Sequence, residues 1–318
     1  MKTGLISDRN YKDLTIFDNF RYAITTLYPD IKDVNSAKDL DGLDVVFLPH
    51  PNHGPHLQIC AKLGFLERCN ELGIKLVVFF SEKVGIDNSK PEIQYIRGTH
   101  DRFFEYFERI NPILFKNIYS DEDQKLRCFN HLKEANNSII YTYDVDDCIQ
   151  FGLKLFRVAL SKKFKYLREV IPFSKRRKEI VFCGHTYKNF TFDRNGLIRF
   201  IKRSQLPIDY RVKHDFPSWY EYMSFLSGYQ YGLSPLGNGN GFASRFYELL
   251  TLKLIILQQV HKNTLQYYDK EAAFKNCIFF ETGEDLLLQL KEYQISEEWS
   301  ELWLEDILTE LLTEINLL

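Results

Sequence analysis

The sequence has little of what marks secreted, fibrous or membrane-spanning chains. Its 318 residues include only 6 cysteines, 16 glycines and 10 prolines, and the cysteines form no C-x-x-C pair and have no histidine at ligand spacing. This pattern argues against a disulfide framework or a common zinc site and favours buried thiols in a reducing compartment. No run approaches the roughly 20 apolar residues that cross a bilayer, and the N-terminus lacks a signal-peptide segment. We therefore expect a cytoplasmic protein.

A surplus of charge of either sign is also lacking. The chain has 41 Lys and Arg against 43 Asp and Glu, a net charge of -2, which gives no global argument for a polyanionic partner. What is present is a globular composition, 45% hydrophobic and 15% aromatic. This length predicts two domains of roughly 150 residues each. We expect most aromatic rings in the core and some in a cleft, where sugar or base rings stack on them.

Short apolar runs alternate with helical patterns through the first half of the chain. Runs at 44–49 and 75–81 are typical of buried parallel strands, and a helix is predicted between them at 57–72. A further strand at 139–143 precedes a helix that Asp144 caps. We assign residues 1–156 to a first Rossmann-like domain.

The alternation restarts after a basic segment at 157–178, which predicts a linker. Nine Lys or Arg residues lie in this segment: Arg157, Lys162, Lys163, Lys165, Arg168, Lys175, Arg176, Arg177 and Lys178. Residues 179–295 then form a second domain of strands and helices. At 296–318 apolar residues recur every fourth position among seven acids, which predicts a long amphipathic helix packing back on the domains. The fold class is therefore α/β, with two doubly wound domains facing a cleft.

One stretch of the second domain predicts an anion site. A strand leads into a loop with Gly237 and Gly239, and a helix then opens at Ser244 with Arg245 and Glu248 in its first turns. Amide groups at a helix start, the positive end of the helix dipole and an arginine together hold phosphate. Glu248 lies one turn on and can accept from two sugar hydroxyls. The alternatives are a dinucleotide fold, whose glycine pattern matches poorly, and an ordinary Arg–Glu pair on a surface helix.

The string from Arg245 to Leu250, followed by a strand at 254–257, resembles the R-x-x-E-x-L motif of GT-B glycosyltransferases. The resemblance implies two Rossmann-like domains with the donor nucleotide sugar bound by the second and the acceptor by the first. It makes Glu248 the ligand of the nucleotide ribose and Arg245 a phosphate ligand, without a required cofactor. UDP-sugars are the leading donor.

Two further stretches resemble the phage DNA β-glucosyltransferases, a GT-B family. The strand and loop at 180–188 are similar to the first loop of their donor domain, which makes Gly184, Lys188 and Arg194 donor-site candidates. A solvated helix-start residue is the alternative for Arg194. A strand ending in Ser81-Glu82 matches the place of their catalytic base, so the resemblance implies that role for Glu82, although the surrounding residues do not match.

Histidines give other candidates for the base. His50, His53 and His56 follow a strand directly, where doubly wound folds place ligands, and a neutral histidine such as His53 can deprotonate a sugar hydroxyl. The same spacing fits a metal site or a structural role. In the pair His100-Asp101, Asp101 can orient the ring.

The sequence Asp144-Val-Asp146-Asp147 resembles the D-x-D metal motif of GT-A glycosyltransferases, whose carboxylates bridge a divalent cation to the diphosphate. The same residues also suit a helix cap, and we expect no metal site.

The sequence thus predicts a hexosyl- or pentosyltransferase. The resemblance and the basic segment suggest hydroxymethylated pyrimidine in DNA as the acceptor, hence DNA modification. The alternatives are a transferase that acts on a cell-surface glycan or lipid-linked sugar, a metal-dependent GT-A transferase that uses Asp144 and Asp146, and a non-catalytic nucleotide-binding protein. The oligomeric state is not predicted.

Overall fold

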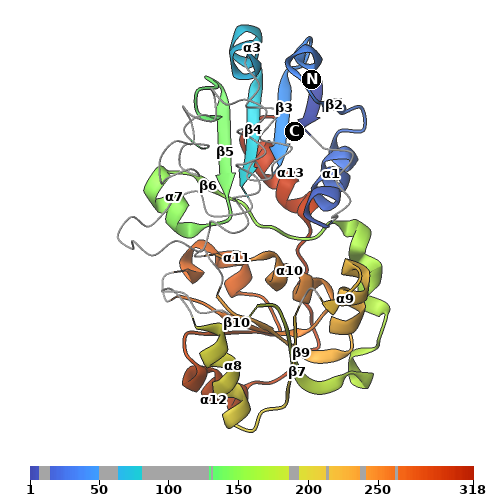
Figure 1. The fold of residues 1–318 in the computed structure, drawn as a ribbon, viewed down its shortest axis with the longest axis vertical. Coiled ribbons are helices and arrows are strands. Elements are labelled where there is room, and N and C mark those ends of the chain that lie inside the picture. The colour runs from blue at the N-terminus through green and yellow to red at the C-terminus, as the bar shows by residue number, and fades with distance from the viewer. Residues whose placement is uncertain are drawn as a thin grey trace. The chain divides into compact units, whose positions relative to one another are not determined.

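The chain folds into two compact units, Met1–Phe156 and Arg157–Leu318 (Figure 1). The computed structural model describes residues 1–6, 15–49, 64–80, 129, 132–185, 193–212, 215–236, 241–261 and 264–318. Each unit contains one sheet, and every strand pair recorded in the two sheets is parallel. This confirms the predicted α/β class with two Rossmann-like sheets.

The first unit is built on a six-stranded sheet of order β2-β1-β3-β4-β5-β6. Its strands are β1 (Thr3–Ile6), β2 (Lys32–Val34), β3 (Val45–Pro49), β4 (Lys75–Phe80), β5 (Ser138–Thr142) and β6 (Lys154–Leu155). Its described helices are α1 (Thr15–Leu27), α3 (Phe65–Leu72), α7 (Val145–Phe151) and the 3-10 helix η1 (Ala37–Leu40). Strands β3 and β4 are almost entirely buried, as continuous apolar runs in a covered parallel sheet should be.

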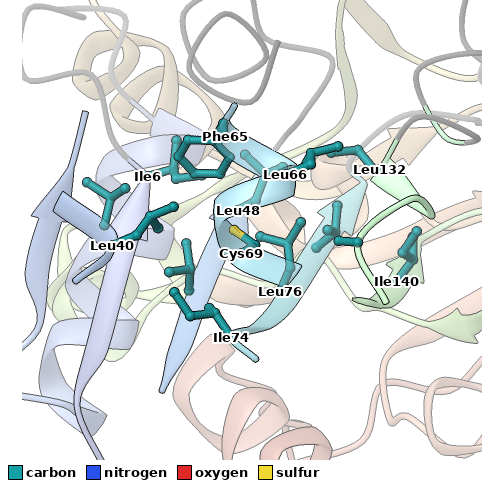
Figure 2. Packing of buried hydrophobic residues seen from close by; sticks show 14 of the residues in the cluster. Ile6, Leu40, Leu48, Phe65, Leu66, Cys69, Ile74, Leu76, Leu132 and Ile140 are labelled. Atoms are coloured by element: carbon teal, nitrogen blue, oxygen red, sulfur yellow. The ribbon is translucent and has the colours of Figure 1, made fainter. Parts of the chain in front are cut away.

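One part of the core of the first unit lies between this sheet and helix α3. Figure 2 shows Phe65, Leu66 and Cys69 of α3 beside Leu48 of β3 and Leu76 of β4. The spacing of the three α3 residues places them on one face of the helix. Burial raises the pKa of the Cys69 thiol to about 12, in line with the predicted buried thiols.

The second unit is built on a five-stranded sheet of order β11-β10-β9-β7-β8. Its strands are β7 (Arg177–Cys183), β8 (Ile208–Arg211), β9 (Tyr229–Ser234), β10 (Ile255–Gln259) and β11 (Cys277–Phe280). Its described helices are α8 (Arg194–Arg203), α9 (Trp219–Leu226), α10 (Ser244–Thr251), α11 (Asp269–Ala272), α12 (Gly283–Glu292), α13 (Leu304–Glu314) and the 3-10 helices η3 (Lys162–Glu169), η4 (Phe173–Lys175) and η6 (Leu265–Tyr267). Helix α10 packs closely on β9, because a Cβ on Gly232 would lie 2.5 Å from the side chain of Leu249.

Both sheets reverse their strand order at one point. In the first, β1 lies between β2 and β3; in the second, β7 lies between β8 and β9. Open α/β sheets bind ligands outside the carboxyl ends of the strands at such a switch point. In the second unit that point is marked by the ends of β7 and β9.

The segment 157–178, for which the composition suggests a linker, lies within the second unit and forms η3 and η4. Two of its cations, Arg168 and Arg176, are buried. They donate to backbone oxygens at the end of α10, Arg168 to Thr251 and Arg176 to Leu252. Part of this positive charge therefore serves the fold, since cations stabilise the negative end of a helix.

The C-terminal helix begins later than its periodicity predicts, at Leu304. The residues before it have other contacts that compete with a helix: Trp299 packs on Phe173 with 5.1 Å between ring centres, and Ser300 accepts from the amide of Lys275. Glu305 is buried and accepts from Ser161 at 2.7 Å, which fastens α13 within the second unit. Among the described helices, none has the length and apolar character needed to cross a membrane.

Candidate donor site

The candidate site lies in the second unit, where β7 and β9 end. Strand β7 ends at Cys183 and is followed by buried Gly184 and exposed His185, while β9 ends at Ser234. Helix α10 carries Arg245 back to the end of β7. The start of α10 and the chain that follows β7 at Gly184 thus meet at the switch point of this sheet.

The guanidinium of Arg245 rests directly on Gly184. A Cβ on Gly184 would lie only 2.7 Å from one terminal nitrogen of Arg245, so glycine is what permits this contact. The guanidinium carbon lies 4.9 Å from the ring centre of Phe182, within cation–π range. The Nε atom of Arg245 is buried and has no hydrogen-bond partner among the residues that the structure describes. Because a buried donor without an acceptor is costly, this arginine is suited to an anionic ligand.

The start of α10 adds further donors at the same place. Among the described residues, no side chain caps this helix, whose N-cap residue is Ala243. The loop entering it is held from the other side: the amide of Phe242 donates to the hydroxyl of Tyr268 at 3.1 Å, and the two rings stack at 4.2 Å. Ser244, the first residue of the helix, is half-buried. Amide groups of a helix start, beside an arginine, are a favourable setting for phosphate oxygens.

Glu248 lies one turn further along α10 and is 4% exposed. Its Oε1 accepts from Nε1 of Trp219 at 3.2 Å, and its Oε2 accepts from the hydroxyl of Tyr222 at 2.8 Å. Both donors belong to α9. The carboxylate of Glu248 is therefore buried and fixed by two hydrogen bonds, one turn along the helix from Arg245. It is not a solvated partner in a surface Arg–Glu pair.

Arg194 connects the two strand ends that border the site. It is the first residue of α8, whose N-cap Asp193 accepts from the amide of Gly196 at 2.7 Å. Its Nε donates to the carbonyl of Leu236, beyond β9, at 2.9 Å, and its Nη1 lies 3.4 Å from the carbonyl of His185, beyond β7. The side chain therefore helps set the spacing of the two loops. Its role as a phosphate ligand stays a prediction.

The thiol of Cys183, at the end of β7, is buried. Burial raises the pKa of Cys183 to about 12, an effect that the nearby positive charge of Arg245 opposes. Cys183 is 1% exposed. Its thiol is therefore protonated near neutral pH and is a packing group, not a nucleophile.

Several predicted site residues lie outside the described residues. These are the candidate bases Glu82, His53 and Asp101, the donor-site candidates Lys188, Gly237 and Gly239, and the neighbouring histidines His50, His56 and His100. Their roles stay predictions.

The D-x-D sequence is accounted for by helix capping. Asp144 is fully buried and its Oδ1 accepts from the amides of Asp146 at 3.0 Å and Asp147 at 3.2 Å, at the start of α7. Asp147 is also buried and accepts from the hydroxyl of Thr142 at 3.1 Å. Within the described ranges, no cluster of three or more His, Cys, Asp or Glu residues is arranged to hold a metal ion. The capping interpretation of these aspartates is the one that their contacts support.

Sequence reasoning missed Phe182, Trp219 and Tyr222 as site residues. Trp219 and Tyr222 are three residues apart, which puts both on one face of a helix. That spacing was available in the sequence, but nothing in it shows that this face of α9 meets α10. Phe182 was visible only as one apolar residue of a buried strand.

Comparison with known proteins adds a likeness of fold. No protein-family model matches the sequence, and no curated protein matches it. Among solved structures, the chain is similar to an α-glucosyltransferase in complex with UDP-glucose and DNA containing an abasic site, with 9% identity, a TM-score of 0.43, and 84% of this chain and 81% of that chain covered.

Two further solved structures resemble the chain. One is a UGT transferase from Siraitia grosvenorii in complex with UDP, with 9% identity, a TM-score of 0.41, and 93% and 91% of the two chains covered. The other is an α1,3-fucosyltransferase, with 13% identity, a TM-score of 0.43, and 99% and 90% covered. At this level of similarity the likeness is one of fold.

Proposed function

We propose that the protein is a glycosyltransferase that binds a nucleotide sugar, with a UDP-sugar as the leading donor, at the switch point of its second unit. The observation that carries this proposal is Arg245, whose guanidinium lies at the carboxyl end of a parallel strand, over the ring of Phe182 and against Gly184. Its buried Nε has no partner within the described part of the chain. A diphosphate oxygen supplies the missing acceptor.

In this proposal, different residues of the site bind the diphosphate and the ribose of the donor. Arg245 and the amides at the start of α10 bind the diphosphate, with Ser244 beside them, and Glu248 accepts from the ribose hydroxyls. Lys188, Arg194, Gly237 and Gly239 complete the phosphate side in this proposal. The absence of a side chain at Gly184 leaves room for the guanidinium of Arg245, which binds the diphosphate in this proposal.

The chemistry follows from where charge develops. The acceptor oxygen attacks the anomeric carbon, the bond from that carbon to the diphosphate oxygen breaks, and its electron pair leaves with the nucleoside diphosphate. Arg245 and the helix start are fixed positive groups at the oxygen that gains charge, so they stabilise the transition state more than the ground state. The acceptor's proton passes to a base of the first unit, for which Glu82, His53 and Asp101 are the candidates.

Hydroxymethylated pyrimidine in DNA is the acceptor we propose first. Of the basic segment 157–178, the cations with exposed side chains are Lys162, Lys163, Lys165, Lys175, Arg177 and Lys178. Retention on a DNA column that falls steeply with salt would support this acceptor, because each phosphate contact releases a counterion. Retention on acidic vesicles without retention on DNA would instead favour a lipid-linked or surface glycan acceptor.

Incubation with a panel of nucleotide sugars, followed by measurement of the nucleoside diphosphate released, tests the proposed activity. We expect release from one class of donor, with an Arg245→Met preparation as the control for contaminating activity. Binding of nucleotide without release or transfer from any donor, in the presence of hydroxymethylated DNA or candidate glycans, would identify a nucleotide-binding protein instead.

A further inference from the structure

The contacts of Glu248 point to a role for helix α9 that neither the sequence motif nor the fold assigns. Both carboxylate oxygens accept from this helix, one from Trp219 and one from Tyr222. A carboxylate offers about four acceptor positions, so two donors on two different oxygens fix the plane of the group.

The two donors are themselves held in place. The indole of Trp219 meets the ring of Phe164 at 4.9 Å and that of Tyr220 at 5.4 Å, both edge-on. Tyr222 is 1% exposed and meets Phe216 edge-on at 5.8 Å. Helix α9 is anchored at its start by Ser218, whose hydroxyl accepts from the amide of Glu221 at 3.2 Å. The donors therefore present fixed positions to Glu248.

Tyr222 remains a donor over the working pH range. Burial raises the pKa of its phenol well above the ordinary value, and the negative charge of Glu248 raises it further, while Arg245 opposes this. The phenol keeps its proton, and a hydrogen bond to a charged acceptor is among the stronger kinds in proteins.

We infer that Tyr222 and Trp219 are positioning residues for donor recognition: they hold the Glu248 carboxylate in one orientation, and this orientation makes the site select ribonucleotides over 2′-deoxyribonucleotides. The inference rests on the proposed function, because it assumes that Glu248 meets the ribose. It goes beyond that function by assigning sugar selectivity to two residues of α9 that act through Glu248.

The test compares the affinities for UDP and 2′-deoxy-UDP by calorimetry. Tyr222→Phe removes only the hydroxyl, and Trp219→Phe removes the indole donor. Tyr220→Phe is the matched control, since it deletes a phenol from the same helix at a side chain 49% exposed. We expect wild type and Tyr220→Phe to prefer UDP by about tenfold or more, as loss of a hydrogen bond to a charged group predicts. In Tyr222→Phe the preference should fall toward one, with the 2′-deoxy-UDP affinity changed less than twofold.

The possible outcomes distinguish the positioning role of Trp219 and Tyr222 from the proposed function on which it rests. An unchanged preference in both Tyr222→Phe and Trp219→Phe would overturn the inference and leave the proposed function standing. Equal affinities of wild type for the two nucleotides would overturn the inference together with the ribose role of Glu248, but not the phosphate role of Arg245. A wild type that binds neither nucleotide would contradict the proposed UDP donor. If Tyr222→Phe fails to fold, Trp219→Phe gives the same comparison.

Discussion

At the scale of single residues, the site depends on the close contact between Gly184 and the guanidinium of Arg245. Gly184 has no side chain where the guanidinium of Arg245 lies, and its φ is outside the left-handed region, so alanine can adopt its backbone conformation. The contact is steric and local. It couples two segments that lie about sixty residues apart in the sequence.

Replacing Gly184 by alanine should move the guanidinium of Arg245 and weaken UDP binding about tenfold, since a charge-assisted bidentate contact depends on geometry. The clashing atoms are the far end of a flexible side chain, so we expect the free energy of unfolding to change by less than about 1 kcal/mol. Calorimetry with UDP and urea unfolding give the two values. Unchanged UDP affinity in a folded Gly184→Ala protein would mean that Arg245 is not the phosphate ligand.

Residue roles were predictable only where they follow a local pattern. Arg245 and Glu248 stand in a short motif at a helix start, so their chemistry is visible in the sequence. Trp219 and Tyr222 come from another helix, and their hydrogen bonds to Glu248 depend on how α9 and α10 pack. Apolar periodicity predicts that a helix is buried on one face, but not which partner it meets.

At the scale of elements, α10 is the helix that carries the site and it is held at both ends. Near its start, Phe242 stacks on Tyr268. At its end, Arg176 donates from one terminal nitrogen to the carbonyls of Leu252 at 2.7 Å and Lys253 at 3.1 Å. Arg176 is 5% exposed, and its hydrogen bond to Leu252 is buried while that to Lys253 is part-buried. Water therefore has little access to the carbonyl of Leu252.

Arg176→Met should therefore destabilise the second unit by about 3 kcal/mol, because it leaves the buried carbonyl of Leu252 and the part-buried carbonyl of Lys253 without their charged donor. Lys175→Met is the matched control: it removes a neighbouring positive charge whose side chain is exposed, and we expect a change within about 0.5 kcal/mol. Urea unfolding of the two variants measures the difference. Equal stability of both would show that the C-terminal end of α10 does not need this cap.

The same elements show why the basic segment was misleading as a sequence pattern. A run of Lys and Arg with one acid is typical of a solvated linker, yet Arg168 pairs with Glu301 and lies over the ring of Trp303 at 4.6 Å. Its partners come from more than a hundred residues further along the chain. Composition cannot show contacts of that separation.

At the scale of the whole molecule, the two units repeat one topology, a parallel sheet with its first strand between the second and third. The central strands were predictable because parallel strands covered on both faces are continuous apolar runs. The edge strands β2, β6 and β11 and the first strand β1 were not predicted, since two to four residues give too short a pattern.

Each unit also buries a cysteine thiol whose pKa is higher in the folded protein than in the unfolded chain. Burial raises the pKa of Cys69 in the first unit and of Cys183 in the second to about 12. An unfolded thiol ionises near pH 8.5, so above that pH the unfolded state loses protons that the folded state keeps. Stability should therefore fall as pH rises from about 9 toward 12, by about 1.4 kcal/mol per thiol and pH unit. In Cys183→Ala, the urea midpoint of the second unit should fall less between pH 8 and pH 10 than in wild type; an equal fall would contradict the expected linkage.

In the proposed function Arg245 binds the diphosphate of a nucleotide, and a calorimetric comparison of UDP with uridine tests this role. Arg199→Met is the control, since it makes the same chemical change at an exposed position of α8. We expect Arg245→Met to lower the affinity for UDP by about ten- to hundredfold, as loss of a charge-assisted contact predicts, and to leave the affinity for uridine unchanged. Arg199→Met should match wild type for both. Equal UDP affinity of Arg245→Met and wild type, or an equal loss for uridine and UDP, would contradict the account.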